Sequence, residues 1–349
     1  ATFARNDKTG EWSLSGCNAI PLEQLPPERH ELLSTSLREF LRRRHVPHRP
    51  NHGRYDLAIL SNPTEAEAPS DPEALRRFER AAEAEGFAVE MIERDDYSRV
   101  GEFDALFIRE TTAVNHHTFR FAQRAAAAGL VVIDDPESIL RCTNKVFLAE
   151  ALQRHGVPAP RTMIAHRGNV AHVAETLGLP CVLKQPDSSF SQGVVKAKDL
   201  DEFREQMAAL LRRSDLVVAQ AFMPTDFDWR IGVLAGKALY ACRYYMARRH
   251  WQIISREGGS RSEGNAEAVP LEQVPHAVLE VATKAASLMG DGLYGVDLKE
   301  VDGLPYVIEV NDNPSIDAGY EDGVLGEQLY RAIMADFLRR LDERRTPAR

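Results

Sequence analysis

Apolar segments alternate with amphipathic ones between residues 55 and 135, and this alternation restricts the fold more than any other feature of the chain. Two helices, over 71–85 and 115–128, are expected among four short apolar strands, YDLAIL, FAVEMI, FDALFI and LVVIDD. Several of these strands are apolar throughout, so both faces of their sheet must be covered, as in parallel sheets with helices on each side. The sequence therefore predicts a small parallel α/β domain.

The chain after this domain predicts an α+β organisation. An amphipathic helix starts near Thr143 and ends at Gly156, close to two prolines. The strands expected beyond it are RTMIAH, CVLKQP, LVVAQAF, WRIGVLAG, ALYACRYYMA and a hairpin over 293–310, with helices over 169–178, 199–212, 276–289 and about 324–341. The chain thus divides into four segments, 1–50, 51–140, 141–222 and 223–349, the first of which is expected to hold one amphipathic helix over 25–44.

The acidic composition limits the partners. With 52 acidic and 43 basic residues among 349, the net charge is −9 and the pI about 5.7, so no general attraction to nucleic acid or to an anionic membrane is expected. No apolar stretch reaches the roughly 18 residues of a membrane span, and the first ten residues lack the apolar core of a signal peptide. The four cysteines have no CxxC spacing, which is typical of free thiols in a reducing compartment. We expect a cytoplasmic protein without a nucleic-acid or membrane partner.

Polar side chains interrupt the strand PYVIEVNDNPSID, which follows the strand LYGVDLKE. Because side chains alternate along a strand, Val307, Glu309 and Asn311 share one face. A three-residue loop with Gly303 in the left-handed position would pair Val307 with Asp297, making Asp297 and Glu309 diagonal neighbours roughly 7–8 Å apart. A two-residue loop would place these two carboxylates on opposite faces.

In the first register, Asp297, Glu309 and Asn311 gather around a space left bare at Gly295. Such carboxylates repel one another unless a cation lies between them. An all-oxygen donor set favours Mg²⁺, which commonly shares phosphate oxygens of a nucleotide. The alternative is that a lysine or arginine satisfies Glu309 while Asn311 only caps a turn.

The segment CVLKQPDSSFSQGVVKA has the properties of a phosphate site. Lys184 lies inside an apolar strand, where an unpaired ammonium group is costly. The Ser- and Gly-rich loop after it offers hydroxyls and backbone N–H groups to phosphates, although most such loops are only turns and this one lacks the GK[ST] element of a Walker loop. Lys145, at the start of a helix, is a second candidate, although helical lysines are commonly solvated.

Taken in order, six segments resemble the ATP-grasp superfamily, and specifically its RimK-like carboxylate–amine ligases of the alpha-L-glutamate type. They are CTNKVFLAEALQRHGVPAPRT, CVLKQPDSSFSQGVV, VVAQAF, DWRIGVL, LYGVDLKE and VIEVNDNPS. FDALFIRETTAVNHHTFRFA and NDNPSIDAGYEDGVLGEQLY resemble a RimK-like subgroup with an additional N-terminal domain. The resemblance implies that 1–50 is the tail of a missing upstream domain, 51–140 a pre-ATP-grasp α/β domain, 141–222 the small ATP-grasp subdomain with the phosphate loop, and 223–349 the C-terminal subdomain with the metal site.

The resemblance also implies an ATP site between two α+β subdomains. Two lysines and the loop 187–193 would contact the phosphates, and the backbone at the end of the strand VVAQAF would face adenine. Asp228 would approach the ribose or the substrate, or would only begin a strand. The implied ATP-binding residues are Lys145, Lys184, Ser188, Ser189, Ser191, Gln192, Gly193, Gln220, Ala221, Phe222 and Asp228, and the implied ligands of two Mg²⁺ ions, or of Mn²⁺, are Asp297, Glu309 and Asn311.

The reaction that the resemblance implies joins an acid to an amino acid such as glutamate. The acid would be a small molecule, a peptide or a protein, activated by ATP as an acyl phosphate, with ADP and phosphate released. The chain departs from better-known members at Ala221, where many have an acidic residue, and over YYMARRHWQIISREGG, so the substrates cannot be assigned by analogy. A homo-oligomer is implied by the resemblance alone.

An arginine is expected beside the oxyanion of the tetrahedral intermediate. Arg230, Arg243 and Arg248 are the catalytic candidates, with Arg248 favoured, and each is otherwise a surface ion-pair residue. The histidines at 116, 117 and 250 are possible bases, although the first two more commonly cap a helix or line a domain contact.

Two other functions fit the same residues. One is a non-catalytic ATP-binding regulator that kept the fold, and the other is an ATP-grasp phosphotransferase that stops after phosphoryl transfer. The complete set of charged and amide residues favours the ligase, since a regulator has little physical reason to keep Lys145, Lys184, Asp297, Glu309 and Asn311. Carboxylates of Asp297 and Glu309 on opposite faces, or arginine contacts in place of ions, would overturn the ligase interpretation.

Overall fold

The structure is a computed structural model that describes residues 2–5, 12–16, 26–35, 53–187, 193–247, 254–255 and 262–345. The chain forms two units, Ala1–Asn51 and His52–Arg349. In the first unit, β1 (Thr2–Arg5) pairs with β2 (Trp12–Gly16) in an antiparallel hairpin, and the short 3₁₀ turn Pro27–Arg29 leads into helical residues 30–35. The rest of the helix predicted over 25–44 lies outside the described residues.

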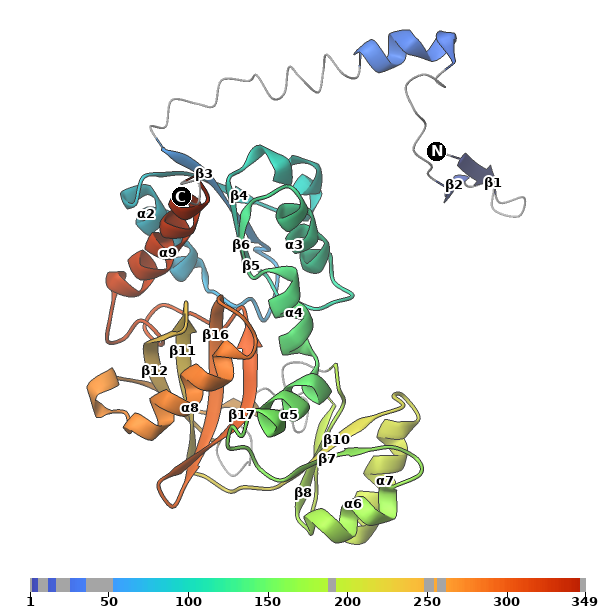
Figure 1. Ribbon diagram of the computed structural model, residues 1–349, viewed down its shortest axis with the longest axis vertical. Coiled ribbons are helices and arrows are strands. Elements are labelled where there is room, and N and C mark those ends of the chain that lie inside the picture. Colours follow the sequence, from blue (N-terminus) through green and yellow to red (C-terminus); the bar gives the residue numbers. More distant parts are fainter. Residues whose placement is uncertain are drawn as a thin grey trace. The chain divides into compact units, whose positions relative to one another are not determined.

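The second unit begins with the predicted parallel sheet (Figure 1). Its strands are ordered β4-β3-β5-β6 and span Phe87–Ile92, Tyr55–Ser61, Ala105–Arg109 and Val131–Ile133. Alternate residues of β3 enter different cores: Leu57 and Ile59 pack toward helix α2 (Pro72–Ala84), while Ala58 and Leu60 pack toward helix α3 (His117–Ala127). The strands are therefore apolar on both faces because both faces are covered.

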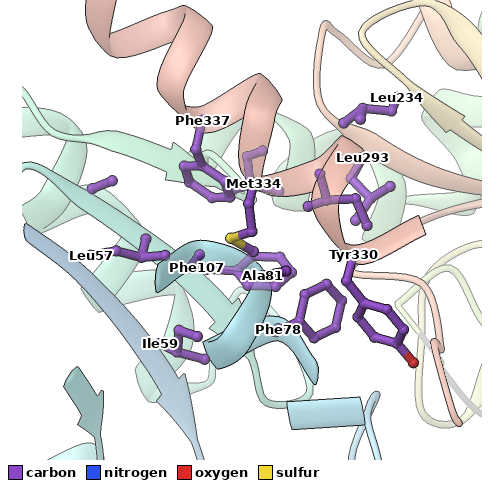
Figure 2. Close-up of a cluster of buried hydrophobic side chains, with 14 of the residues drawn as sticks. Leu57, Ile59, Phe78, Ala81, Phe107, Leu234, Leu293, Tyr330, Met334 and Phe337 are labelled. Atoms are coloured by element: carbon purple, nitrogen blue, oxygen red, sulfur yellow. The ribbon is translucent and has the colours of Figure 1, made fainter. Parts of the chain in front are cut away.

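The last helix of the chain returns to this sheet. Helix α9 (Glu327–Arg345) packs beside α2, and Figure 2 shows Tyr330, Met334 and Phe337 of α9 against Phe78 and Phe107. The rings of Phe78 and Tyr330 meet edge to face at 4.7 Å between centroids. The terminal helix therefore completes the core of the N-terminal sheet, although the sequence pattern assigned it to the segment 223–349. The boundaries of the four segments, 1–50, 51–140, 141–222 and 223–349, remain predictions.

A four-stranded antiparallel sheet of order β7-β10-β8-β9 follows helices α4 (Pro136–Thr143) and α5 (Lys145–Arg154). Helices α6 (Val170–Leu177) and α7 (Leu200–Leu211) supply its core, which includes Val173 and Phe203. The strands span Thr162–Ala165, Val217–Ala221, Cys181–Lys184 and Val194–Ala197 in sheet order. The last of these was missed in the sequence, because it follows the polar loop directly.

A five-stranded antiparallel sheet of order β15-β12-β11-β16-β17 forms the third layer. Its strands span Ala266–Val269, Lys237–Tyr245, Phe227–Leu234, Leu293–Val301 and Leu304–Asp312. Helix α8 (His276–Ser287) covers one face with an apolar core that includes Trp229 and Ile231. The opposite face carries the charged residues discussed below. A parallel sheet followed by two antiparallel sheets is the predicted fold class.

Arg109, the last residue of β5, joins the N-terminal sheet to the segment after β17. Its side chain is 0% exposed and donates to the Ser70 hydroxyl, to the Asn313 side-chain oxygen at 2.7 Å and to the carbonyls of Pro69 and Pro314. Burial lowers the pKa of Arg109 to about 10, which leaves the guanidinium charged at neutral pH. This buried arginine therefore fixes the position of residues that directly follow the strand with Glu309 and Asn311.

Two smaller expectations concern membranes and thiols. Among the described residues, none of the helices has both the length and the apolar character needed to cross a membrane. Cys142, Cys181 and Cys242 are buried free thiols, as predicted, and Cys17 lies outside the described residues.

Candidate active site

The hairpin of β16 and β17 differs from the register that the sequence predicted. Val301 pairs with Leu304, so the loop has two residues, Asp302 and Gly303, both with positive φ (53° and 75°). A turn of this kind requires positive φ at both central positions and suits a tight antiparallel hairpin. The prediction of a three-residue loop was therefore wrong.

A β-bulge nevertheless places the two carboxylates on one face. The pairing shifts by one residue between Leu298–Val307 and Asp297–Glu309, which leaves Ile308 as the extra residue of β17. Asp297 and Glu309 are thus directly opposite each other rather than diagonal. The bulge also breaks the alternation, because Val307 lies in the core under α8 while Glu309 faces the other side of the sheet, so the prediction that these two share a face was wrong.

Side-chain cations accompany all three carboxylates on this face. Arg230 binds Asp297 through two hydrogen bonds, from Nε to Oδ1 and from Nη2 to Oδ2. Lys145, the first residue of α5, lies 3.0 Å from Glu309. Lys299 lies 2.5 Å from Asp228 and also donates to Thr225.

Lys184 is a fourth cation near this group. It is 8% exposed, and within the described part of the chain no carboxylate lies at ion-pair distance from it. Four cations and three carboxylates therefore meet at one place, which we call the charged array: Lys145, Lys184, Asp228, Arg230, Asp297, Lys299 and Glu309. Among the described residues of the array, the cations exceed the carboxylates by one, and this excess suits an anionic ligand.

Burial and neighbouring charges shift the pKa values within the array. Burial raises the pKa of Asp297, although Arg230 opposes this effect. Burial acts on Glu309 in the same direction, but the ammonium groups of Lys145 and Lys184 outweigh it and lower the pKa of Glu309. Glu309 is therefore held as a carboxylate, and its side chain is still 31% exposed, so a solute can reach it.

These contacts correct the predicted metal site in two respects. The space at Gly295 is not bare, because a Cβ atom there would lie 2.8 Å from Pro314 and 3.1 Å from Arg230. Glu309 is held by a lysine, as the alternative interpretation described, and Asp297 is held by an arginine, which is the contact that was expected to overturn the ligase interpretation. Asn311 donates to Asp297 at 3.2 Å rather than capping a turn.

The donor set itself still fits Mg²⁺. Asp297, Glu309 and Asn311 lie on one face and offer only hard oxygen ligands, although Oδ2 of Asp297 already accepts hydrogen bonds from both Arg230 and Asn311. The assignment of these residues as metal ligands remains a proposal.

Arg243 lies on the other face of the sheet. It pairs across the strands with Trp229, which belongs to the core under α8. Its guanidinium lies over the rings of Phe227 and Trp229 at 5.1 and 5.0 Å and is 3.7 Å from Glu267. The prediction of Arg243 as a catalytic candidate therefore does not fit the structure, whereas Arg230 lies within the charged array.

A family model described as the RimK-like ATP-grasp domain matches residues 142–324, slightly more than half of the chain. The chain belongs to the RimK-like ATP-grasp family. This membership confirms the resemblance drawn from the sequence and the expectation of an ATP-binding enzyme of the ligase class. The narrower subgroup with an additional N-terminal domain stays a prediction.

Individual relatives of this ATP-grasp protein are similar at modest identity. Alpha-aminoadipate–LysW ligase LysX of Saccharolobus solfataricus is 29% identical over 195 residues, which are 53% of this chain and 67% of that protein. A probable alpha-L-glutamate ligase of Teredinibacter turnerae is 25% identical over 263 residues, which are 70% of this chain and 85% of that protein.

A solved structure matches the fold of this ATP-grasp protein. The RimK domain protein of Sphaerobacter thermophilus superposes with a TM-score of 0.61 at 17% identity, covering 81% of this chain and 98% of that one. This likeness confirms the predicted fold class.

The predicted phosphate residues are partly described. In the ATP-grasp fold of this chain, the loop between β8 and β9 is closed by the Gln185 N–H, which donates to the Gly193 carbonyl at 3.0 Å. Gly193 has φ of 67°, a left-handed backbone conformation that glycine adopts more readily than other residues. The Lys145 N–H donates to the carbonyl of Pro186, which brings α5 to the start of this loop. The other predicted loop residues, Ser188, Ser189, Ser191 and Gln192, lie outside the described residues.

A chain of hydrogen bonds positions Lys184. Its ammonium donates to the Gln220 side-chain oxygen at 2.9 Å, and the Gln220 amide donates to the Thr162 hydroxyl at 3.1 Å. Gln220 is therefore a hydrogen-bond partner of Lys184, the predicted phosphate lysine, and the sequence did not indicate this contact. The backbone N–H groups of Ala221 and Phe222 donate to the carbonyls of Arg161 and Pro180, so the predicted backbone contact with adenine has to come from carbonyl groups of this segment.

Lys299 was missed as a site residue. The alternation of LYGVDLKE places it on the same face as Asp297, but nothing in the sequence indicates its partner on β11. Asp228 is the second residue of β11 and is occupied by this lysine, so a ribose contact would have to compete with the ion pair. Arg248 and His250 lie outside the described residues.

We predict that Lys184→Met weakens ATP binding roughly 10- to 100-fold, because a hydrogen bond to a charged group contributes about 1.5–3 kcal/mol. Isothermal titration calorimetry of the full chain with ATP measures the loss. Lys198→Met, at an exposed position just beyond β9, is the matched control and should bind like the wild type. Equal affinities for wild type and Lys184→Met would exclude the phosphate role.

The same lysine predicts a pH dependence. Burial, together with Lys145 and Lys299, lowers the pKa of Lys184 from 10.5 to about 8, against the opposing effect of Glu309 and Asp228. The ammonium form therefore predominates below pH 8 and is lost progressively above it. ATP affinity of the wild type should fall between pH 7 and 9.5, and this fall should be absent in Lys184→Met. A parallel pH profile in the two proteins would assign the titration to another group.

Proposed function

We propose that this chain is an ATP-dependent carboxylate–amine ligase that joins an acid to an amino acid through an acyl phosphate and releases ADP and phosphate. The names of its relatives support glutamate as the amino acid, since one of them is a probable alpha-L-glutamate ligase. The acid is a small acid, a peptide or a protein, and one relative, LysX, is named as a ligase of alpha-aminoadipate and LysW.

One observation carries this proposal: Lys145, Lys184 and Arg230 converge with Glu309 and Asp297 on the open face of one sheet. Helix α5 delivers the first lysine, the small sheet delivers the second, and the large sheet delivers the other three residues. Cations that come from three parts of the fold can surround a triphosphate, which a single surface ion pair does not do.

The proposed reaction has two steps. A carboxylate oxygen of the acid attacks the γ-phosphorus of ATP, the bond to the bridging oxygen breaks, and ADP leaves. The amine nitrogen then attacks the acyl carbon, phosphate leaves with the bonding electrons, and the amine loses a proton as the amide forms. Neither step uses a covalent nucleophile of the protein.

The residues of the array act by position and charge. Lys145 and Lys184 would hold the phosphoryl oxygens, and Arg230 would stabilise negative charge near Asp297. Mg²⁺, held by Asp297, Glu309 and Asn311, would neutralise charge on the phosphates. Two ions are proposed, as the resemblance implies, and Mn²⁺ could replace them.

A screen of ADP release against paired libraries of acids and amino acids, with mass spectrometry of the products, tests the proposal. The expected product has the combined mass of acid and amino acid less one water. Hydroxylamine added during turnover should trap the acyl phosphate as a hydroxamate. ATP binding without ADP release for any pair would indicate a regulator, and phosphorylated acid without amide or hydroxamate would indicate a phosphotransferase.

A further inference from the structure

A second group of metal-binding side chains lies in the N-terminal domain, away from the charged array. Glu110 directly follows strand β5, and His116 and His117 form the start of helix α3. One oxygen of Glu110 and one nitrogen of each histidine lie within 4.8 Å of one another. In open parallel sheets, ligands bind at the carboxyl ends of the strands, which is where this group lies.

The Glu110 carboxylate is buried in ion-pair contact with His117, without a well-formed hydrogen bond from any described residue at the contacting oxygen. Glu110 is 1% exposed, and its Oε2 has no hydrogen-bond partner within the described part of the chain. This oxygen faces Nε2 of His117, which is also buried and without a hydrogen bond there. Buried polar atoms without a hydrogen bond are rare in folded proteins, and a bound ion is one of their ordinary explanations.

The second histidine is oriented in the manner of a metal ligand. The Thr118 hydroxyl donates its single proton to the Thr111 carbonyl at 3.1 Å, so it must accept a hydrogen bond from Nδ1 of His116, which lies 3.0 Å away. Nδ1 of His116 therefore carries the proton, and Nε2 carries a lone pair. Metal-binding histidines commonly donate their other N–H to such a partner, which fixes both the tautomer and the ring orientation.

We propose that Glu110, His116 and His117 bind a divalent transition-metal ion of the Zn²⁺ type. Two imidazoles and one carboxylate favour Zn²⁺ over Mg²⁺, which prefers oxygen ligands alone. With three protein ligands, a fourth position is left for water or a substrate atom. This site is distinct from the oxygen-only site proposed at Asp297 and Glu309.

The site is coupled to the ATP-grasp domain through the backbone. The Asn313 amide donates to the Glu110 carbonyl, and the preceding residue Arg109 donates to the side-chain oxygen of Asn313. An ion at the proposed site would therefore hold the segment 110–117 in place and, through Asn313, the segment that follows strand β17.

Titration of the metal-free full chain with Zn²⁺, without ATP or Mg²⁺, tests this proposal. We expect one equivalent to bind to the wild type, and Co²⁺ at the same site to give a visible ligand-field spectrum that Zn²⁺ displaces. His116→Ala and Glu110→Gln should each weaken binding at least tenfold and remove the Co²⁺ spectrum. Thr118→Val, which keeps the side-chain shape but removes the acceptor for His116, should weaken binding by roughly 10- to 100-fold.

Two controls locate the ion. His172→Ala, at an exposed position on α6, should bind Zn²⁺ like the wild type. Glu309→Gln should also bind normally, because it alters only the other site. Thermal unfolding in the absence of metal shows whether each variant is folded, and Thr118→Val is the variant that best preserves the packing.

Three results would overturn the proposal. The first is that the wild type binds neither Zn²⁺ nor Co²⁺ stoichiometrically. The second is that Thr118→Val and Glu110→Gln, tested separately, both bind the metal with unchanged affinity. The third is that Glu309→Gln loses metal binding while His116→Ala keeps it. The first two would leave Glu110 and His117 as a buried ion pair only. The third would place the ion in the charged array.

Discussion

Glu309→Gln should reduce turnover by about 100-fold or more while the protein stays folded. The amide keeps the shape of the side chain but removes the negative charge that holds Lys145 and that we propose binds Mg²⁺. A loss of roughly 3 kcal/mol of transition-state stabilisation corresponds to about two powers of ten in rate. Steady-state ADP release with the substrate pair found in the screen measures turnover, and circular dichroism with thermal unfolding checks the fold.

A second readout separates the metal role from the lysine contact. ATP binding to the wild type should strengthen when Mg²⁺ is added, and this gain should shrink in Glu309→Gln and in Asp297→Asn. Glu300→Gln is the matched control, because Glu300 belongs to the same hairpin but accepts a hydrogen bond from Trp229 instead. Near-normal turnover and an unchanged Mg²⁺ effect in both site variants would contradict the metal assignment.

Arg109→Met should lower the free energy of unfolding by about 3–5 kcal/mol, which is the cost of removing one partner from a buried charged network. The methionine fills much of the space but leaves the Ser70 hydroxyl, the Asn313 oxygen and two carbonyls without their donor. Chemical denaturation of the full chain, with ΔG extrapolated to water, measures the effect.

The matched control for this prediction is Arg99→Met on the same domain. Arg99 makes ion pairs with Glu90, Asp96 and Glu102, but its side chain is 36% exposed, so solvent replaces most of what is lost and the cost should stay below about 1 kcal/mol. Similar losses in the two variants would mean that the buried network does not stabilise the junction between β5 and the segment after β17.

The local elements were largely predictable from sequence because their signals are local. Helix α2 begins after Asp71, whose side chain caps it, and α5 begins after the capping residue Asn144. The parallel strands could be predicted because apolar side chains on both faces imply two covered faces. The packing partner of helix α9 could not be predicted. Its apolar residues show that the helix is buried, but they do not show which sheet it packs against.

The hairpin shows how a correct expectation, that Asp297 and Glu309 share a face, followed from a wrong register. The sequence assigned a three-residue loop, whereas the loop has two residues and the bulge at Ile308 supplies the missing shift. The loop is one residue shorter than predicted, and the bulge adds one residue to β17. These two differences cancel, so Asp297 and Glu309 still share a face. A bulge leaves no clear mark in an apolar strand, because Val307 and Ile308 are equally apolar and only packing decides which of them enters the core.

The sequence by itself determined the family, the order of strands and helices and the identity of the charged residues, because the chemistry of each side chain and the short-range pattern are properties of the chain. Only the tertiary structure decided the partners: Arg230 for Asp297, Lys145 for Glu309, Lys299 for Asp228 and Gln220 for Lys184. It also placed Arg243 on the wrong face for catalysis and brought Glu110 to His117. Charge pairing depends on distance in space and on burial, and neither can be read from positions along the chain.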